Sequence, residues 1–427
     1  MNLYLQVFTN RRVAILLLLG FSSGLPLALT FGTLQAWMKD TGIDLATIGA
    51  VTLLGLPYTL KYLWAPLMDR YTPPFLGRRR GWLVITQLGL LAAITFMGSM
   101  DPAQQPLLLF ATAVTVSFLS ASQDIVVDAY RADILREEEL GAGAAVSVLG
   151  YRLAMLVSGA MALILADHLS WQAIYQIMAA LMLVGVTAAL LGPEPEVAGA
   201  PHTLAAAVTE PFRAFFRREA ALFVLLFIVL YKLPDAIAGA MTTPFLMDVG
   251  FSKTDIGAVN KGLGLVATIV GALAGGALIA RLGLYRSLWA FGILQAVTNL
   301  TYLGVALLGQ NYTALILAVG TDNLSGGMGS AAFVAFLMSL TERRYSATQY
   351  ALLSSPDGHH PQDHRRARRR DGGGHRLAAV LQRQRARRAA GSGIAVVAHA
   401  ARGDRPQNRD GAGADGLTFF QSAANRR

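Results

Sequence analysis

Two aspartates stand four positions apart near one end of a long apolar stretch. Residues 107–130 read LLLFATAVTVSFLSASQDIVVDAY, so a helix would place Asp124 and Asp128 on one face, with Ser120 and Gln123 close by. About 20 apolar residues are enough to cross a bilayer, and an ionised Asp at the bilayer centre costs about 2.5–3.5 kcal/mol on insertion scales. Acids in such a position are usually functional. We therefore predict a proton-titrating or substrate-facing wall inside a transporter.

A structural interpretation of the same pair stays open. Asp128, and with it Asp124, would then lie at the headgroup boundary and pair with Arg131. If the acids are functional, we expect Asp124 to be the proton-coupling site and Asp128 to assist it, because Asp124 lies deeper in the apolar stretch.

The composition is that of a polytopic membrane protein. Of the 427 residues, 54% are hydrophobic and 15% are charged, against about 45–50% and about 25% in soluble domains. The chain has no cysteine, which excludes disulfides, thiolate metal sites and cysteine nucleophiles. The first apolar run lacks a small-residue cleavage site, so we interpret it as a spanning helix and not as a signal peptide.

Ten apolar segments are long enough to be membrane spans. They are residues 13–38, 47–67, 82–98, 107–130, 144–165, 171–191, 220–245, 256–282, 288–308 and 314–340. We expect a six-helix half over residues 1–191, a linker on the cytoplasmic membrane surface over 192–218, and a second half over 219–354 with four spans and the start of a fifth.

Charge and an internal repeat support this organisation. The loops on one side of the predicted membrane hold 15 Lys and Arg residues and those on the other hold two, which places the N-terminus in the cytoplasm. The segment GIDLATIGA at 42–50 is echoed by GFSKTDIGA at 250–258, each leading into the second span of its half. Transporters built from such repeats bind substrate near the midplane between the halves.

The loop between the second and third spans reads PLMDRYTPPFLGRRR over residues 66–80. An acidic and basic pair followed by glycine and a basic run resembles the signature loop of the major facilitator superfamily. That resemblance implies a gating role for five residues, namely Asp69, Arg70, Gly77, Arg78 and Arg79. The alternative is a positive-inside loop with an exposed ion pair, worth about 0–1 kcal/mol.

Other segments resemble a narrower group, the AmpG-type muropeptide permeases of that superfamily. They are SASQDIVVDA at 120–129, GAGAAVSVLGYRLAMLVSG at 141–159, GGMGSAAFVAFL at 326–337 and SATQYALLS at 346–354, and the likeness covers about residues 11–354. It implies an all-α, multi-pass inner-membrane protein of two six-helix halves that imports anhydromuropeptides by proton symport, for peptidoglycan recycling and β-lactamase induction. The residues alone indicate only a carrier with a charged cavity, so a coenzyme-A ester, a sugar or a drug stays open as the substrate.

A large anionic sugar-peptide would need cations and aromatic faces in its cavity. Eight residues inside the predicted spans supply them or could pair with them: Lys61, Tyr62, Tyr151, Arg152, Lys232, Asp235, Lys261 and Asp322. Arg152 could grip a carboxylate with two hydrogen bonds or form a salt bridge to Asp124 or Asp128. Lys232 and Asp235 could simply neutralise one another.

Several classes of function are not indicated. We find no Walker sequence, no metal-ligand cluster and no credible Ser/His/Asp set, so we expect a monomeric carrier without a cofactor and without enzymatic activity. Its expected partners are the muropeptide, protons and the lipid bilayer. Nucleic acid is not among them, because few aromatic residues lie between the arginines of the basic segment.

That basic segment is the last part of the chain. Residues 355–427 hold 15 Arg, 6 Asp and neither Lys nor Glu, a net charge of +9 out of the chain's +10. The family pattern calls for two further apolar spans here. We expect that a frameshift or sequencing error has replaced spans eleven and twelve; the alternative is a real disordered basic tail on the cytoplasmic face. An inactive truncated product stays open as an alternative to a working carrier.

Overall fold

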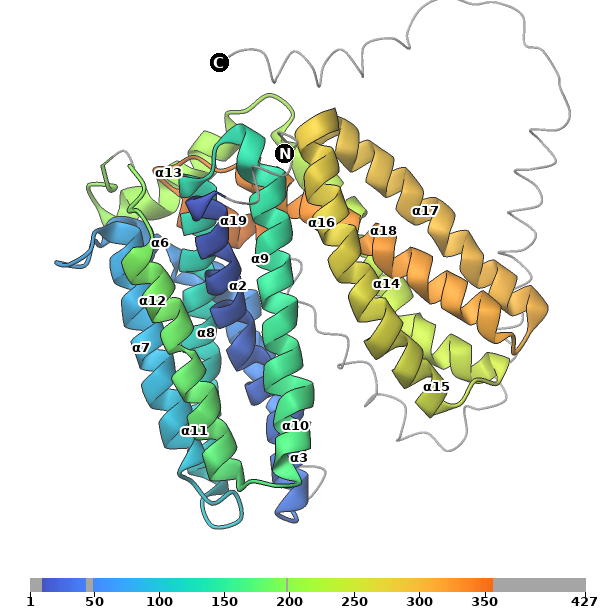
Figure 1. Ribbon diagram of the computed structural model, residues 1–427. Helices are drawn as coiled ribbons and strands as arrows, with labels where there is room; N and C mark the ends of the chain where they lie inside the picture. Colours follow the sequence, from blue (N-terminus) through green and yellow to red (C-terminus); the bar gives the residue numbers. More distant parts are fainter. Residues whose placement is uncertain (1–9, 44–48, 197–198, 356–427) are drawn as a thin grey trace, which may run out of the picture. The chain divides into compact units, whose positions relative to one another are not determined.

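The computed structural model describes residues 10–43, 49–196 and 199–355, without the side chains at 50, 235–238, 240 and 261. Within these ranges every regular element is a helix (Figure 1). The all-α prediction is therefore confirmed.

Helices of different lengths make up most of the first half. They are α2 (Arg11–Thr30), α3 (Gly32–Asp40), α5 (Leu56–Leu60), α6 (Ala65–Arg70), α7 (Arg78–Gly98), α8 (Pro106–Ile134), α9 (Leu140–Met155), α10 (Ala162–Ala166), α11 (Trp171–Leu181) and α12 (Leu183–Leu191). A π-helical turn, Leu156–Met161, joins α9 to α10, so these two elements form one continuous helical segment.

The second half follows a surface helix. The surface helix is α13 (Leu204–Phe216), and the second half contains α14 (Ala221–Val249), α15 (Lys253–Ala258), α16 (Leu265–Leu282), α17 (Leu284–Leu308), α18 (Tyr312–Ser339) and α19 (Ser346–Ser354). A π-helical turn, Val259–Gly264, joins α15 to α16.

The described residues contain seven helical segments that are long and apolar enough to cross a membrane. Helices α14 and α18 have 29 and 28 residues, which at about 1.5 Å per residue exceeds the hydrocarbon core of about 30 Å. Neither of these two helices nor the segment 50–70 is among the seven, so the ten-span organisation stays a prediction.

The segment 50–70 is the one that departs most from a regular helix. A 3₁₀ turn, Ala50–Gly55, precedes the short helix α5, and a second one, Lys61–Leu63, separates α5 from the short helix α6. Pro57 and Pro66 stand at the beginnings of those helices. Proline is favoured in the first turn of a helix, because the N–H groups there have no intrahelical acceptor.

Glycines allow pairs of helices within each half to approach closely. A Cβ atom added at Gly150 of α9 would lie 2.2 Å from the Leu17 carbonyl of α2, and one at Gly271 of α16 would lie 2.0 Å from the Leu324 carbonyl of α18. Small residues have this use in bilayers, where helices associate by close packing. Gly275, one turn after Gly271 on α16, has the same use: a Cβ atom there would lie 2.8 Å from the Met328 Cα of α18.

The two halves also meet through glycines. A Cβ atom at Gly276 of α16 would lie 2.7 Å from both the Ala145 side chain and the Gly141 carbonyl of α9. Helix α9 contacts α18 as well, and α19 contacts α6 and α8. The close contact between α9 and α16 therefore requires a glycine at position 276.

We expect Gly276→Leu to lower the free energy of unfolding by about 1–3 kcal/mol, the usual effect of overpacking. Thermal unfolding of the purified protein measures the change. Gly304→Leu is the matched control, because no atom lies within 4 Å of a Cβ built at Gly304. Equal midpoints for the two variants would contradict the assigned close contact.

Candidate functional site

A cavity of about 200 Å³ lies between helices of the two halves. Helices α2, α8 and α9 line it from the first half, and α18 and α19 from the second. The lining residues are Gly20, Ser23, Asp124, Val127, Asp128, Arg131, Ser147, Val148, Tyr151, Val334, Leu337, Tyr350 and Ser354. Both predicted acids are among them, so they face a space that is shared by the two halves.

Helix α8 positions these acids. From Ser120 to Arg131 only Asp124 and Asp128 are partly exposed, while the other residues are buried. The helix places them one turn apart on the same face, as the spacing predicted. The hydroxyl of Ser23 on α2 donates a hydrogen bond to the Asp124 carboxylate.

Asp128 differs from Asp124 in its charged neighbours. Its two carboxylate oxygens pair with the Lys61 ammonium at 3.5 Å and with the Arg131 guanidinium at 2.7 Å. Among the described residues Asp124 forms no ion pair. A proton added to Asp124 would therefore break no ion pair, whereas Asp128 lies between two cations.

Arg131 is a site residue that the sequence prediction missed. Its pairing with Asp128, part of the structural interpretation of the two acids, is present in the structure. Helix α8 continues to Ile134 and buries the Arg131 side chain. Its guanidinium donates to the Ser147 hydroxyl at 2.9 Å and to the Tyr350 hydroxyl of α19 at 2.8 Å. The sequence signal that could have identified Arg131 as a site residue is its position three residues after Asp128, a spacing at which helical side chains meet.

The signature loop forms a buried network at one end of the bundle. The predicted pairing of Asp69 with Arg70 is wrong: the Asp69 carboxylate pairs with the Arg79 guanidinium at 2.9 Å, and Arg70 lies over the Tyr71 ring. Arg79 also pairs with Asp133 of α8 at 2.7 Å. All three side chains of this network are fully buried, so the exposed-pair alternative does not hold.

The same network reaches the second half through the start of α19. The Asp69 carboxylate accepts hydrogen bonds from the backbone N–H groups of Ala347 and Thr348, at 3.3 and 2.8 Å, and from the Thr348 hydroxyl at 2.7 Å. Arg79 donates to the Ser346 hydroxyl at 2.6 Å. A carboxylate at a helix N-terminus is favoured by the unpaired N–H groups there. We call Asp69, Arg79, Asp133, Ser346 and Thr348 the interhalf latch.

Two further residues of the loop support the latch. Arg78 donates to the backbone carbonyls of Asp69 and Arg343, both at 3.2 Å. Gly77 has φ +82°, a left-handed conformation that favours glycine. Glu194, which the sequence prediction missed, accepts from the backbone N–H groups of Arg79 and Arg80 at 2.8 and 3.0 Å. It caps the start of α7, and no sequence pattern pointed to it.

Comparison with known proteins identifies the family. The Major Facilitator Superfamily pattern matches residues 16–355. The chain belongs to the major facilitator superfamily. It is 56% identical over 355 residues to the anhydromuropeptide permease of Escherichia coli strain K12, a match that covers 82% of this chain and 72% of that protein. The likeness to AmpG-type permeases is thereby confirmed.

Two further similarities agree with this assignment. The putative transporter AmpG 4 of Rickettsia felis is 35% identical, with 82% of this chain and 87% of that protein covered. The crystal structure of the superfamily transporter FucP in its outward conformation shares the fold, with a TM-score of 0.61 and 12% identity, covering 81% of this chain and 88% of that chain.

Some of the remaining predicted site residues of the first half lie at the cavity, and others lie elsewhere. Tyr151 lines the cavity, and Lys61 reaches it through Asp128. Tyr62 packs on the apolar core. Arg152 is not among the lining residues, and among the described ion pairs none joins it to Asp124 or Asp128. The alternative of an Arg152 salt bridge is therefore wrong.

Two candidates of the second half, Lys232 and Asp322, are not among the residues that line the cavity. The Lys232 ammonium stands 4.8 Å from the centre of the Phe333 ring, and Asp322 accepts a hydrogen bond from the Tyr302 hydroxyl at 3.2 Å. The side chains of Asp235 and Lys261 lie outside the described part of the structure. A substrate role for these four residues remains a prediction.

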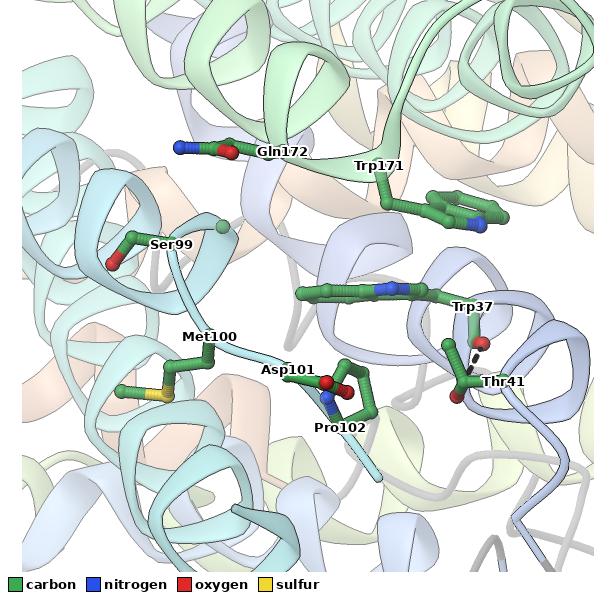
Figure 2. A pocket seen from close by; sticks show the side chains of 9 residues that line it. Trp37, Thr41, Ser99, Met100, Asp101, Pro102, Trp171 and Gln172 are labelled. Atoms are coloured by element: carbon green, nitrogen blue, oxygen red, sulfur yellow. Dashed lines mark hydrogen bonds between the residues drawn. The ribbon is translucent and has the colours of Figure 1, made fainter. Parts of the chain in front are cut away.

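A second cavity, of about 320 Å³, lies where α3, α7 and α11 end or begin (Figure 2). Trp37 and Trp171 stack there with ring centres 6.1 Å apart, and the Trp171 indole donates to Asp40 at 2.9 Å. Trp37 is 3% exposed, so its ring offers little face to a ligand. This cavity joins helix ends and contains none of the predicted site residues.

Proposed function

We propose that this chain is a monomeric secondary transporter of the inner membrane that imports anhydromuropeptides from periplasm to cytoplasm together with protons. The observation that carries the proposal is the cavity that holds Asp124, Asp128 and Arg131 between the two halves. It lies within the region that is 56% identical to the E. coli permease.

The chemistry of the cavity suits this substrate class. An anhydromuropeptide brings carboxylates on its lactyl and peptide groups and flat sugar faces. Arg131 can bind a substrate carboxylate when separation of the halves releases its hydrogen bond to Tyr350, while Tyr151 and Tyr350 supply aromatic faces. A cavity of about 200 Å³ is smaller than the usual ligand site of roughly 300–1,000 Å³, so the halves must separate to admit the substrate.

The arrangement of arginines supports a cytoplasmic N-terminus. Arg11 bonds the Leu191 carbonyl at 2.6 Å, Arg12 pairs with Glu139 at 3.7 Å, and Arg218 pairs with Glu342 at 3.1 Å. The basic loops therefore gather at one end of the bundle, and such loops remain on the cytoplasmic side.

Uptake of a labelled sugar-peptide into energised membrane vesicles tests the proposal. Accumulation should require the proton gradient, and the disaccharide without peptide should compete. Accumulation that persists after the gradient is collapsed would exclude symport. A carrier of coenzyme-A esters or drugs would ignore the disaccharide, which would exclude the substrate assignment.

We expect Arg131→Lys to reduce substrate affinity by at least about tenfold, because an ammonium cannot reproduce the bidentate geometry of a guanidinium. Arg152→Lys is the control on the neighbouring helix α9 and should change affinity by less than about twofold, since Arg152 does not line the cavity. Concentration-dependent uptake gives both values. A larger effect at Arg152 would return the carboxylate-binding role to that residue.

The tail gives a prediction at the level of the gene. If a frameshift has replaced the last two spans, another reading frame after the codon for Ser354 should encode two apolar segments of about 20 residues each. Resequencing this region and translating the other two frames provides the measurement. Should neither frame encode such segments, the arginine-rich tail must be treated as a genuine extension.

A further inference from the structure

Helix α13 has a buried side and an exposed side. Ala207, Pro211 and Phe215 form its buried row, and the helix contacts α6 of the first half and α19 of the second. An exposed apolar row follows the same spacing of four: Leu204 42%, Val208 41%, Phe212 41% and Phe216 58% exposed. This apolar row has no protein covering in the described structure.

A second exposed row lies beside the apolar row. It begins with Ala205 and Thr209 and ends with Arg213 and Arg217, all of them exposed. Among the described hydrogen bonds and ion pairs, none uses the side chain of either arginine. The exposed side of α13 therefore combines apolar side chains with uncompensated positive charge, the pattern of helices that lie in a membrane interface.

The next helix fixes the surroundings of these rows. Helix α14 begins at Ala221, four residues after Arg217, and its first turn carries the strongly exposed Leu222 and Phe223. Because α14 is long enough to cross the bilayer, the end of α13 lies at the level of the lipid headgroups. Arginines at that level extend their side chains toward phosphate groups.

We propose that the exposed side of α13 binds anionic phospholipids of the leaflet that faces the basic loops. The apolar row enters the acyl boundary, and Arg213 and Arg217 bind the phosphates. In a neutral bilayer the choline or ethanolamine group offsets the charge of each phosphate, so the two arginines gain less there than from headgroups with a net negative charge. The charge of the second row thus selects anionic lipid over neutral lipid.

The bound lipid would also act on the interhalf latch. On the other side of α13, Glu210 accepts a hydrogen bond from the Tyr345 hydroxyl, and the Pro211 carbonyl accepts from the Gln349 side chain at 3.3 Å. Gln349 follows Thr348, which bonds Asp69. Lipid that fixes α13 therefore stabilises α19 in the latch. The effect of lipid on the interhalf latch rests on the proposed function, whereas lipid binding to α13 does not.

Spin labels test the placement of the two rows. Because the chain has no cysteine, Val208→Cys and Thr209→Cys each give one labelled site in the full chain, reconstituted in vesicles with and without phosphatidylglycerol. We expect the label at 208 to be accessible to oxygen and shielded from a water-soluble nickel chelate, and the label at 209 to show the reverse. Equal accessibility to nickel at both sites would overturn the proposal, as would a second protein copy covering position 208.

Lipid selectivity tests the role of the arginines. The selectivity of the protein for spin-labelled phosphatidylglycerol over phosphatidylcholine should fall about fivefold per arginine in the double variant R213Q/R217Q. The control R281Q/R286Q removes the same charge from two other exposed arginines, which lie outside the surface helix α13, and should lose less selectivity than R213Q/R217Q. An equal fall in both variants, or none in R213Q/R217Q, would overturn the proposal.

Two additional measurements separate the possible causes. Inorganic phosphate should not displace the labelled lipid; complete displacement would indicate a site for a free anion and overturn the lipid assignment. Uptake should be higher with phosphatidylglycerol in the parent protein and independent of it in R213Q/R217Q. If lipid selectivity falls as expected but uptake is absent from every sample, the proposed function fails while lipid binding stands.

Discussion

Asp124→Asn is expected to abolish accumulation of substrate against a gradient while preserving exchange of substrate across the membrane. The asparagine side chain has the same shape and its oxygen can still accept the hydrogen bond from Ser23. It cannot gain or lose a proton, so the coupled step is lost. Because Asp124 has no ion pair in the described structure, the substitution leaves no cation uncompensated.

The measurement compares two assays of the same vesicles. Uptake driven by a pH gradient should fall to equilibration without accumulation, while counterflow of labelled substrate should continue and become independent of pH. Asp128→Asn is the contrasting variant: it removes the partner of Lys61 and Arg131, so we expect it to impair counterflow as well. Normal accumulation by Asp124→Asn under a pH gradient would show that protons couple elsewhere.

The second large effect concerns the interhalf latch. Arg79→Ala would leave Asp69 and Asp133 buried without their cation, and breaking a buried ion pair from one side costs about 3–5 kcal/mol. Asp69→Asn should cost less, because an amide oxygen can still accept from the α19 backbone. Arg70→Ala is the control and should change the free energy of unfolding by less than about 1 kcal/mol, since its surface contact is with a neighbouring ring. Thermal unfolding ranks the three variants.

Opening of the latch can be followed independently of unfolding. Ala347→Cys places a thiol at a position that is 0% exposed in a chain without other cysteines. Its reaction with a water-soluble maleimide should be slow in the parent background and much faster with Arg79→Ala. The same slow rate in both backgrounds would mean that Arg79 does not hold α19 against the first half.

Tyr345 adds a hydrogen bond near the interhalf latch, and its phenol stays protonated. Burial and the hydrogen bond to Glu210 raise the pKa of Tyr345 to about 12. The raised pKa keeps the phenol neutral and able to donate over the range in which transport would be measured. Changes of uptake with pH in that range should therefore reflect another group, for which Asp124 is our candidate.

Local pattern in the sequence was sufficient for the helices and for part of the site. The length and hydropathy of a segment decide whether it can cross a bilayer, and both depend only on residues close together in the chain. The same holds for Asp124 and Asp128, which share a face because the helix period is fixed. It holds also for Gly271 and Gly275, whose spacing brings two helices together.

The partners of the charged side chains were decided only by the tertiary structure. Asp69 pairs with Arg79 and not with its neighbour Arg70, and Arg131 reaches Tyr350 across 219 positions of the chain. Arg152 stands beside Tyr151 in sequence, yet only Tyr151 lines the cavity. Local spacing places a side chain on one face of its helix, but its partner depends on which helix packs against that face, and that packing is set by contacts far apart in the chain.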